Sequence, residues 1–242
     1  MGAAIGAVLR QRGIDVLWVS AGRTESRAKR AAQAGFRDAE TLCQLVSAAD
    51  VILSVCPPHA ARVVAQSVNG FAGVYVDANA VAPATVREIA EGFTQFVDAA
   101  IVGPPPVESA THLYVSGGEA RRIADLFART LVDARVVSDR IGAASAVKAT
   151  YAAWTKGSAA LLLAIRDVAH VEGVDETLLA EWHESLPGLA ERLDRAEASA
   201  QAKGWRWVGE MEEIAATFAA AGLPDGFHLA AAEIFRRYER MF

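Results

Sequence analysis

One lysine stands among small residues in the second half of the sequence. Lys148 lies in "GAASAVKATYAAWTKGS" (142–158), a stretch with the composition of a helix. Small neighbours leave room for a substrate beside the amine, and desolvation disfavours its charged form. Both conditions suit a general acid or base. The alternative interpretation is a surface lysine whose stem lies along apolar surface. Tyr151 and Thr155 follow at +3 and +7, on or near the same helical face.

Three apolar segments end in loops that could face a ligand, because open α/β sheets bind ligands beyond the carboxyl ends of their strands. In "SVCPPH", Cys56 is followed by Pro57 and Pro58, which fix a turn able to pass close to a cofactor. "VDANAVAP" offers Asp77 and Asn79, and "DAAIVGPPP" ends in a rigid proline run after Gly103. Taken singly, each loop is better explained as an ordinary connection.

The strand expected at 14–20 ends in a basic turn. The turn "SAGRT" holds no Asp or Glu, the acid that binds the ribose 2′-hydroxyl of NAD. Arg23, with Arg27 one helical turn later, offers a planar guanidinium for bidentate bonds to a 2′-phosphate instead. Thr24 is expected to cap the next helix and to add a hydroxyl contact. The turn therefore favours NADP over NAD; the alternative is a solvated basic helix start.

The first residues, "MGAAIGAVLRQRG", have the pattern of a helix that follows a phosphate-binding turn. Doubly wound nucleotide folds begin with a strand, a glycine-rich turn, a helix and a second strand. Gly2 would be the last glycine of that turn and a cofactor contact. We therefore expect the first, central strand to be missing, its neighbours to lack a partner, and cofactor binding to be weak or absent. The alternative is a genuine N-terminal amphipathic helix.

The two halves of the sequence differ in pattern. Strands and helices alternate in the first half, which predicts a doubly wound parallel sheet, Rossmann-like and covered on both faces. The second half reads as helices alone, entered through one long helix from Ala143 to Glu172. We predict an NAD(P)-binding domain at 1–140 and an all-α domain for substrate binding and dimerisation at 141–242. The expected strands are 14–20, 51–55, 74–78, 95–102, 112–118 and 135–138. The expected helices of the first half are 24–35, 39–50, 59–70, 83–92 and 119–132, and those after 172 are 175–185, 188–203, 206–221 and 225–241.

Composition narrows the function classes. The chain has 242 residues and a net charge of −5, which argues against general affinity for nucleic acid or acidic membranes. No segment approaches the roughly 18 apolar residues of a membrane span, and no signal peptide is visible. The two cysteines suggest a reducing compartment, so we expect a cytoplasmic protein. The five histidines show no metal-ligand spacing, and no metal is expected.

Together these motifs resemble the β-hydroxyacid dehydrogenase superfamily, which includes 6-phosphogluconate and 3-hydroxyisobutyrate dehydrogenases. The resemblance covers nearly the whole chain. Its most specific parts are residues 142–158 and the C-terminal "KGWRWVGEMEEIAATFAAAGLPDGFHLAAAEIF". The remaining parts are "MGAAIGAVLRQRG", "SAGR", "SVCPP", "VDANAVAP" and "DAAIVG".

The resemblance implies an NADP-dependent oxidoreductase that transfers hydride between the nicotinamide and a small hydroxy acid or its carbonyl form. Lys148 would be the general acid/base. Asn79 falls where the family keeps a substrate-binding Ser, and Gly103 falls at a glycine of the family's substrate loop. The implied cofactor contacts are Gly2, Arg23, Thr24, Cys56, Pro57, Pro58 and Asn79, and the implied substrate contacts are Asn79, Gly103, Tyr151 and Thr155.

Two departures from the family pattern bear on the substrate. The family places an Asn one turn after the lysine, where this sequence has Ala152. The substrate loop usually ends Ser-Gly-Gly, whereas here it reads Val102-Gly103-Pro104. We therefore expect a substrate other than a simple 3-hydroxy acid.

Other functions stay open at this point. One is a non-catalytic dinucleotide-binding or dimerising remnant, and another is an imine reductase, a class that shares the architecture and often lacks the lysine.

Apolar residues on several faces of 158–171 predict that this helix is buried on several sides. We therefore expect a homodimer formed through the helical domain.

Overall fold

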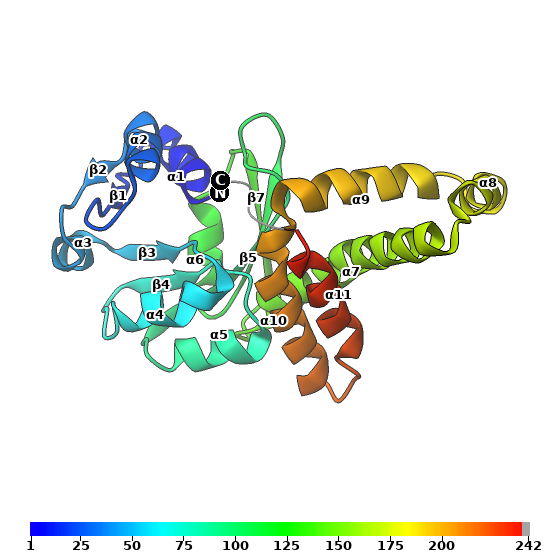
Figure 1. Ribbon diagram of the computed structural model, residues 1–242. Helices are drawn as coiled ribbons and strands as arrows, with labels where there is room; N and C mark the ends of the chain where they lie inside the picture. The colour runs from blue at the N-terminus through cyan, green and yellow to red at the C-terminus, as the bar shows by residue number, and fades with distance from the viewer. Residues whose placement is uncertain (239–242) are drawn as a thin grey trace. The chain divides into compact units, whose positions relative to one another are not determined.

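The computed structural model describes residues 1–238 and divides into two compact units, Met1–Lys148 and Ala149–Phe242. The first unit alternates strands and helices, and the second is helical (Figure 1). The fold is therefore mixed α/β, with a sheet that is mostly parallel followed by a large helical part. No helix within residues 1–238 is long and apolar enough to cross a bilayer.

The main sheet of the first unit has five strands in the order β3-β4-β5-β6-β7. β3, β4 and β5 pair in parallel, but β5 and β6 pair antiparallel, so the expectation of an all-parallel sheet is wrong at this point. The loop between β5 and β6, residues 103–110, is too short for the crossover of a dozen or more residues that a parallel pair needs. The strands are β3 (Val51–Ser54), β4 (Val74–Asp77), β5 (Gln95–Val102), β6 (Thr111–Ser116) and β7 (Val132–Ser138).

A second, two-stranded sheet joins β1 (Leu17–Trp18) and β2 (Arg37–Asp38) in parallel. The strand expected at 14–20 is thus only two residues long, and β2 was not predicted. Among the described strands, β1 pairs only with β2, and β3 pairs only with β4.

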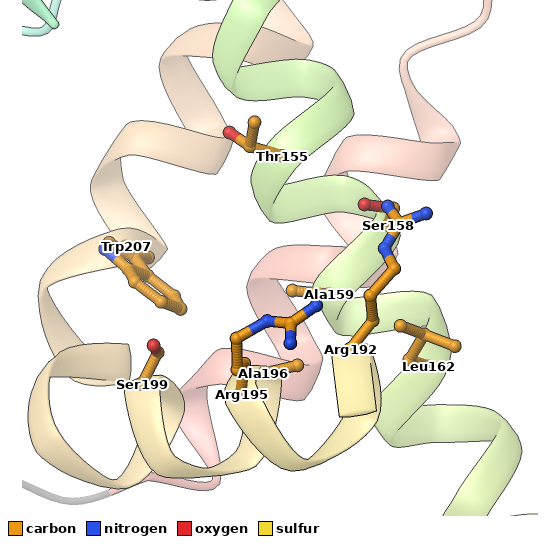
Figure 2. Close-up of a pocket in the computed structure, with 9 residues that line it drawn as sticks. All are labelled: Thr155, Ser158, Ala159, Leu162, Arg192, Arg195, Ala196, Ser199 and Trp207. Atoms are coloured by element: carbon orange, nitrogen blue, oxygen red, sulfur yellow. The ribbon is translucent and has the colours of Figure 1, made fainter. Parts of the chain in front are cut away.

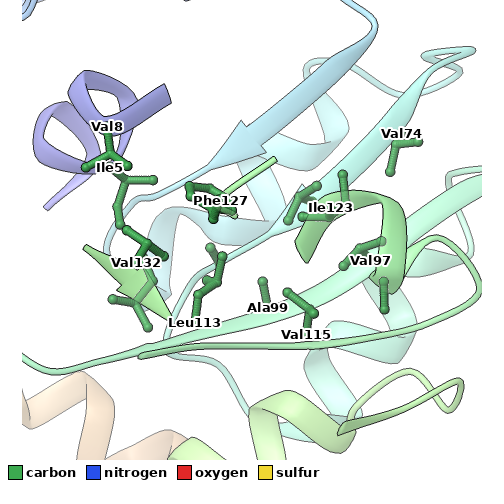
Figure 3. Close-up of a cluster of buried hydrophobic side chains, with 14 residues drawn as sticks. Ile5, Val8, Val74, Val97, Ala99, Leu113, Val115, Ile123, Phe127 and Val132 are labelled. Carbon is green, nitrogen blue, oxygen red and sulfur yellow. The ribbon is translucent and has the colours of Figure 1, made fainter. Parts of the chain in front are cut away.

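Helices cover both faces of the main sheet. On one face, α1 and α6 bury Ile5, Val8 and Ile123 against the strands, and Phe127 completes the layer (Figure 3). On the other face, α4 and α5 bury Ala65 and other apolar side chains (Figure 1). The helices of this unit are α1 (Gly2–Gln11), α2 (Glu25–Gln33), α3 (Leu42–Ala48), η1 (Pro58–Ala60), α4 (Ala61–Gln66), α5 (Pro83–Ala90) and α6 (Ala120–Asp125). The helices expected at 39–50, 59–70 and 119–132 are therefore shorter than predicted.

A row of buried polar side chains crosses four strands of the main sheet. Ser54 is in register with Asp77, Asp77 with Asp98, and Asp98 with Ser116. All four are at most 4% exposed. We call these four residues the polar row. Ser54 and Asp77 end β3 and β4, at the edge where open α/β sheets bind ligands.

Within residues 149–238, the second unit consists of most of α7, four further α-helices and the short 3₁₀ helix η2. Its core is built from Leu163, Met211 and Phe235, which are fully buried, together with small residues such as Ala200. The ring of Trp207 packs edge-on against Phe235, with centroids 4.9 Å apart. The helices are α7 (Ala143–Glu172), α8 (Asp175–Ser185), α9 (Leu189–Lys203), η2 (Gly204–Arg206), α10 (Trp207–Ala220) and α11 (Gly226–Arg236).

Candidate active site

The sheet holds the start of α7 through the polar row. Asp98 Oδ2 accepts hydrogen bonds from the backbone amides of Gly142 and Ser145, both at 3.0 Å. Asp98 Oδ1 accepts one from the Ser145 hydroxyl at 2.6 Å. The Ser116 hydroxyl donates to Asp98 Oδ2 at 2.9 Å and accepts the Ala144 amide at 3.1 Å. First-turn amides of a helix have no partner within the helix. Here a buried carboxylate and a hydroxyl from the sheet satisfy them.

Gly142 has the backbone conformation that this junction requires. Its φ is +96°, a region that side chains rarely adopt. A Cβ there would also lie 2.5 Å from Nη1 of Arg87 and 3.2 Å from the Pro83 carbonyl oxygen. Gly142 therefore lets α7 begin close against the first turns of α5.

Lys148 follows Ser145 by three residues, less than one helical turn, and its side chain is half-buried. It is close enough to Asp77 to act on that carboxyl electrostatically. Burial raises the pKa of Asp77 to about 6, and the Asp98 charge adds to the rise, whereas hydrogen bonds from Asn79 and the charge of Lys148 oppose it. The structure thus brings the predicted lysine and the predicted β4 loop together.

Asn79 joins two strand ends. Its side-chain amide donates to the Ser54 hydroxyl and to Asp77 Oδ2, both at 3.0 Å, while its Oδ1 accepts the Cys56 amide at 2.6 Å. Its own backbone amide donates to Asp77 Oδ1 at 3.0 Å. Asn79 is 2% exposed. These bonds fix the loop after β4 against the loop after β3, and they place Asn79 as a buried organiser of the site.

The basic turn lies within electrostatic range of the β3 loop. Burial raises the pKa of the Cys56 thiol, and the Arg23 guanidinium works in the opposite direction. Arg23 is exposed, and its side chain has no hydrogen bond or ion pair with any residue of 1–238. Pro57 precedes the short helix η1 and Pro58 is its first residue. Arg23, Cys56 and Asn79 are therefore neighbours in one region of the first unit.

Sequence reasoning missed an acid beside this turn. Asp38, at the end of β2, accepts the Ser20 amide at 3.2 Å and the Glu40 amide at 2.8 Å. Hydrogen bonding, led by the Ser20 hydroxyl, lowers the pKa of this exposed carboxyl. The pairing of β1 with β2 places Asp38 beside the basic turn, and the sequence of the turn does not predict that pairing. Asp38 is engaged in fixing the end of β1.

Thr24 and Gly2, two of the predicted cofactor contacts, lie at the starts of α2 and α1. Thr24 is the N-cap of α2, as predicted, but its side chain accepts no capping hydrogen bond. Gly2 is the first residue of α1, and a Cβ on it would lie 3.5 Å from Val55 Cβ, an ordinary contact. Gly2 therefore lies beside the end of β3, where the expected cofactor turn would pass.

The other predicted substrate residues take no part in these hydrogen bonds. Gly103 follows the end of β5 and has φ +121°, and the Thr111 hydroxyl donates to the carbonyl of the next residue, Pro104. Tyr151 and Thr155 belong to the second unit. There Tyr151 is 56% exposed, and the Thr155 hydroxyl donates to the Tyr151 carbonyl at 3.2 Å. Within residues 1–238, no cluster of His, Cys, Asp and Glu could hold a metal ion.

The helical part of the chain matches a family model, and a curated relative matches a larger share of the chain. Residues 169–238 match the family model described as "Domain of unknown function (DUF1932)". A curated relative, "Uncharacterized 28.5 kDa protein in 7S RNA 5'region" from Methanothermus fervidus, is 30% identical over 169 residues. That match covers 69% of this chain and 66% of the relative, slightly less than two thirds of its length.

Solved structures resemble the whole chain. The conserved protein MTH1747, which is structurally similar to 3-hydroxyacid dehydrogenases, is 26% identical, with a TM-score of 0.70 over 98% of this chain and 92% of that one. The 3-hydroxyisobutyrate dehydrogenase of Mycobacterium tuberculosis, solved with L-serine, is 17% identical, with a TM-score of 0.75 over 98% and 90%. This chain has the 3-hydroxyacid dehydrogenase fold. A reductive aminase from Aspergillus terreus, solved with NADPH, cyclohexanone and allyl amine, is 18% identical, with a TM-score of 0.58 over 98% and 89%.

Proposed function

We propose that this protein is an NADP-dependent oxidoreductase that interconverts a small hydroxy acid and its carbonyl form. One observation carries the proposal. Lys148 lies three residues beyond Ser145 in α7, whose first turn is fixed by Asp98 and Ser116, and it is within electrostatic range of Asp77 at the carboxyl end of β4. The 3-hydroxyacid dehydrogenase fold supports the reaction class.

The residues that would hold the cofactor suit NADP, a dinucleotide that carries a 2′-phosphate. Arg23 is an exposed guanidinium with no ion pair in residues 1–238, which leaves it free for a 2′-phosphate. Gly2, Thr24, Cys56, Pro57 and Pro58 are the other candidate cofactor contacts. When bound, NADP(H) would accept or supply the hydride.

Lys148 would exchange the proton of the reacting oxygen. A neutral amine removes the hydroxyl proton as the substrate is oxidised, and an ammonium returns it in the reverse direction. At neutral pH, Asp77 with its pKa of about 6 is mostly ionised, and a carboxylate favours the ammonium form of a neighbouring lysine. Asn79 and Gly103 are the candidate substrate contacts of the first unit, and Tyr151 and Thr155 those of the second.

The test compares hydride transfer by the native chain, Lys148→Met and the control Lys29→Met. Lys29 is an exposed lysine of α2. 3-Hydroxy acids are incubated with NADP, whereas 2- and 3-oxo acids and imines are incubated with NADPH deuterated at C4, and the products are measured by mass spectrometry. We expect label transfer to at least one acid, with kcat lower by about 100-fold or more in Lys148→Met and unchanged in Lys29→Met. Label transfer to imines alone, undiminished in Lys148→Met, would point to an imine reductase instead.

We also propose a homodimer formed through the helical unit. Trp154, Leu161 and Val168 recur every seven residues along α7 and are 65%, 61% and 64% exposed. A seven-residue repeat of large apolar side chains is the pattern by which helices pair. We also propose a cytoplasmic location, because Cys43 and Cys56 are free thiols, as is usual in a reducing compartment.

A further inference from the structure

A cavity of about 220 Å³ lies between α7 and α9 of the second unit and is open to solvent, so that Arg192 and Arg195 in its wall are exposed. Its polar lining comes from Thr155 and Ser158 on α7, Arg192, Arg195 and Ser199 on α9, and Trp207 at the start of α10. Figure 2 shows both arginine side chains extending from α9 toward α7. Ala159, Leu162 and Ala196 supply the apolar part of the wall. The hydroxyacid reaction proposed above gives this cavity no role beyond Thr155.

No acidic residue of the lining neutralises the positive charges of Arg192 and Arg195 in this cavity. No Asp or Glu lines it, and neither Arg192 nor Arg195 forms an ion pair within residues 1–238. Two nearby carboxylates are already engaged, because Glu197 pairs with Arg166 and Glu210 pairs with Lys156. The Arg192 guanidinium lies 5.7 Å from the ring centroid of Trp154, a cation–π distance that leaves its N–H groups available.

The lining has the chemistry of an oxyanion site. Two guanidinium groups at i and i+3 on one helix face can each make paired, charge-assisted hydrogen bonds to a carboxylate or phosphate. The Ser158 and Ser199 hydroxyls add donors, and the Trp207 ring with Ala159 and Leu162 offers an apolar surface. The volume lies below the roughly 300–1,000 Å³ of drug-sized ligand pockets, so the cavity suits a small molecule.

We propose that this cavity binds a small organic anion through a carboxylate or phosphate group held by Arg192 and Arg195. Apart from Thr155, which is also a candidate substrate contact, this site shares no residue with the reaction proposed for Lys148. Arg192, Arg195, Ser199 and Trp207 all lie in the segment that matches the domain of unknown function, and anion binding would give that segment a ligand.

The test measures the melting temperature of the full chain against inorganic phosphate and against malonate, with ionic strength held constant by KCl. A ligand that binds only the folded state raises the melting temperature saturably. We expect a saturable rise with at least one probe. Phosphate alone would identify a phosphate group as the ligand's anion, and malonate alone would identify a carboxylate.

Variants tie the response to the cavity. Arg192→Gln and Arg195→Gln should each weaken the apparent Kd about tenfold, as expected for loss of charge-assisted hydrogen bonds. Arg206→Gln removes an exposed arginine of the same unit outside the cavity and should leave the response unchanged. If neither phosphate nor malonate raised the melting temperature saturably, the proposal would be overturned. An undiminished response in the double variant Arg192→Gln/Arg195→Gln would also overturn it.

Discussion

Asp98 and Ser145 connect the middle of the main sheet to the first turn of α7. The Ser145 hydroxyl and amide donate to the two oxygens of the Asp98 carboxylate, at 2.6 and 3.0 Å. Asp98 is 0% exposed, and Ser145 is 2% exposed. Because Lys148 follows three residues later, this pair sets where the lysine stands. Asp98 is thus a positioning residue for the proposed general acid/base.

Replacing Asp98 tests this relationship. In Asp98→Asn, one carboxylate oxygen becomes an NH₂ group that faces donors and cannot accept their hydrogen bonds. We expect the free energy of unfolding to fall by about 2–4 kcal/mol, measured by urea denaturation. The matched control is Asp139→Asn, an exposed acid near the same junction, which should change it by less than about 0.5 kcal/mol. Equal stabilities for the two variants would remove Asp98 from this role.

Asp77 should give the protein a pH-dependent stability of defined sign. Burial raises its pKa from 3.8 to about 6, so the folded state holds this proton more tightly than the unfolded state. Its contribution to the free energy of unfolding is therefore fully present below pH 4 and is lost as pH rises through about 6. The loss amounts to about 3 kcal/mol on an order-of-magnitude scale.

The variant Asp77→Asn isolates this effect. It cannot ionise, so its stability relative to the native chain should rise by about 3 kcal/mol between pH 4 and pH 7. Chemical denaturation at several pH values measures the difference, and Asp139→Asn again serves as the control. A stability difference that stays constant over this range would show that Asp77 does not titrate as its burial requires.

The proposed homodimer depends on the seven-residue repeat of Trp154, Leu161 and Val168. Leu161→Asp places a charge in the middle of that repeat and should convert the dimer to a monomer in sedimentation velocity, since burying an unpaired charge is costly. Val63→Asp is the matched control, because Val63 is equally exposed, at 66%, but lies on α4 of the first unit. A native chain that sediments as a monomer at all concentrations would contradict the dimer.

The sequence predicted the parts of the site that depend on local pattern. Lys148 was found because its neighbours are small, and Asn79 because it follows a short apolar strand. Asp98 begins the segment "DAAIVGPPP", but its role as the acceptor of hydrogen bonds from the start of α7 depends on strand register. Asp98 meets Ser145 across 47 positions of sequence because β5 pairs with β6 in one register. No local pattern encodes that register.

The same limit explains the errors in the fold. Apolar runs predicted five strands close to where they occur, but an apolar run does not specify strand direction. The antiparallel β6 follows from the short, proline-rich connection at 103–110, whose length was the overlooked signal. The strand β2 consists of Arg37 and Asp38, both exposed, so it has no apolar signature. The cavity arginines were missed because their juxtaposition with α7 depends on the packing of α9.

The most direct measurement is a titration of the chain with NADPH and with NADH, followed by quenching of tryptophan fluorescence. The native chain and Arg23→Gln are compared, with Arg12→Gln, an exposed arginine just beyond α1, as the control. We predict weak but saturable binding that prefers NADPH, with the preference lost in Arg23→Gln, retained in Arg12→Gln, and the affinity for NADH unchanged. Equal affinities for the two cofactors in the native chain, or no binding of either, would contradict an NADP-dependent oxidoreductase that reads its cofactor through Arg23.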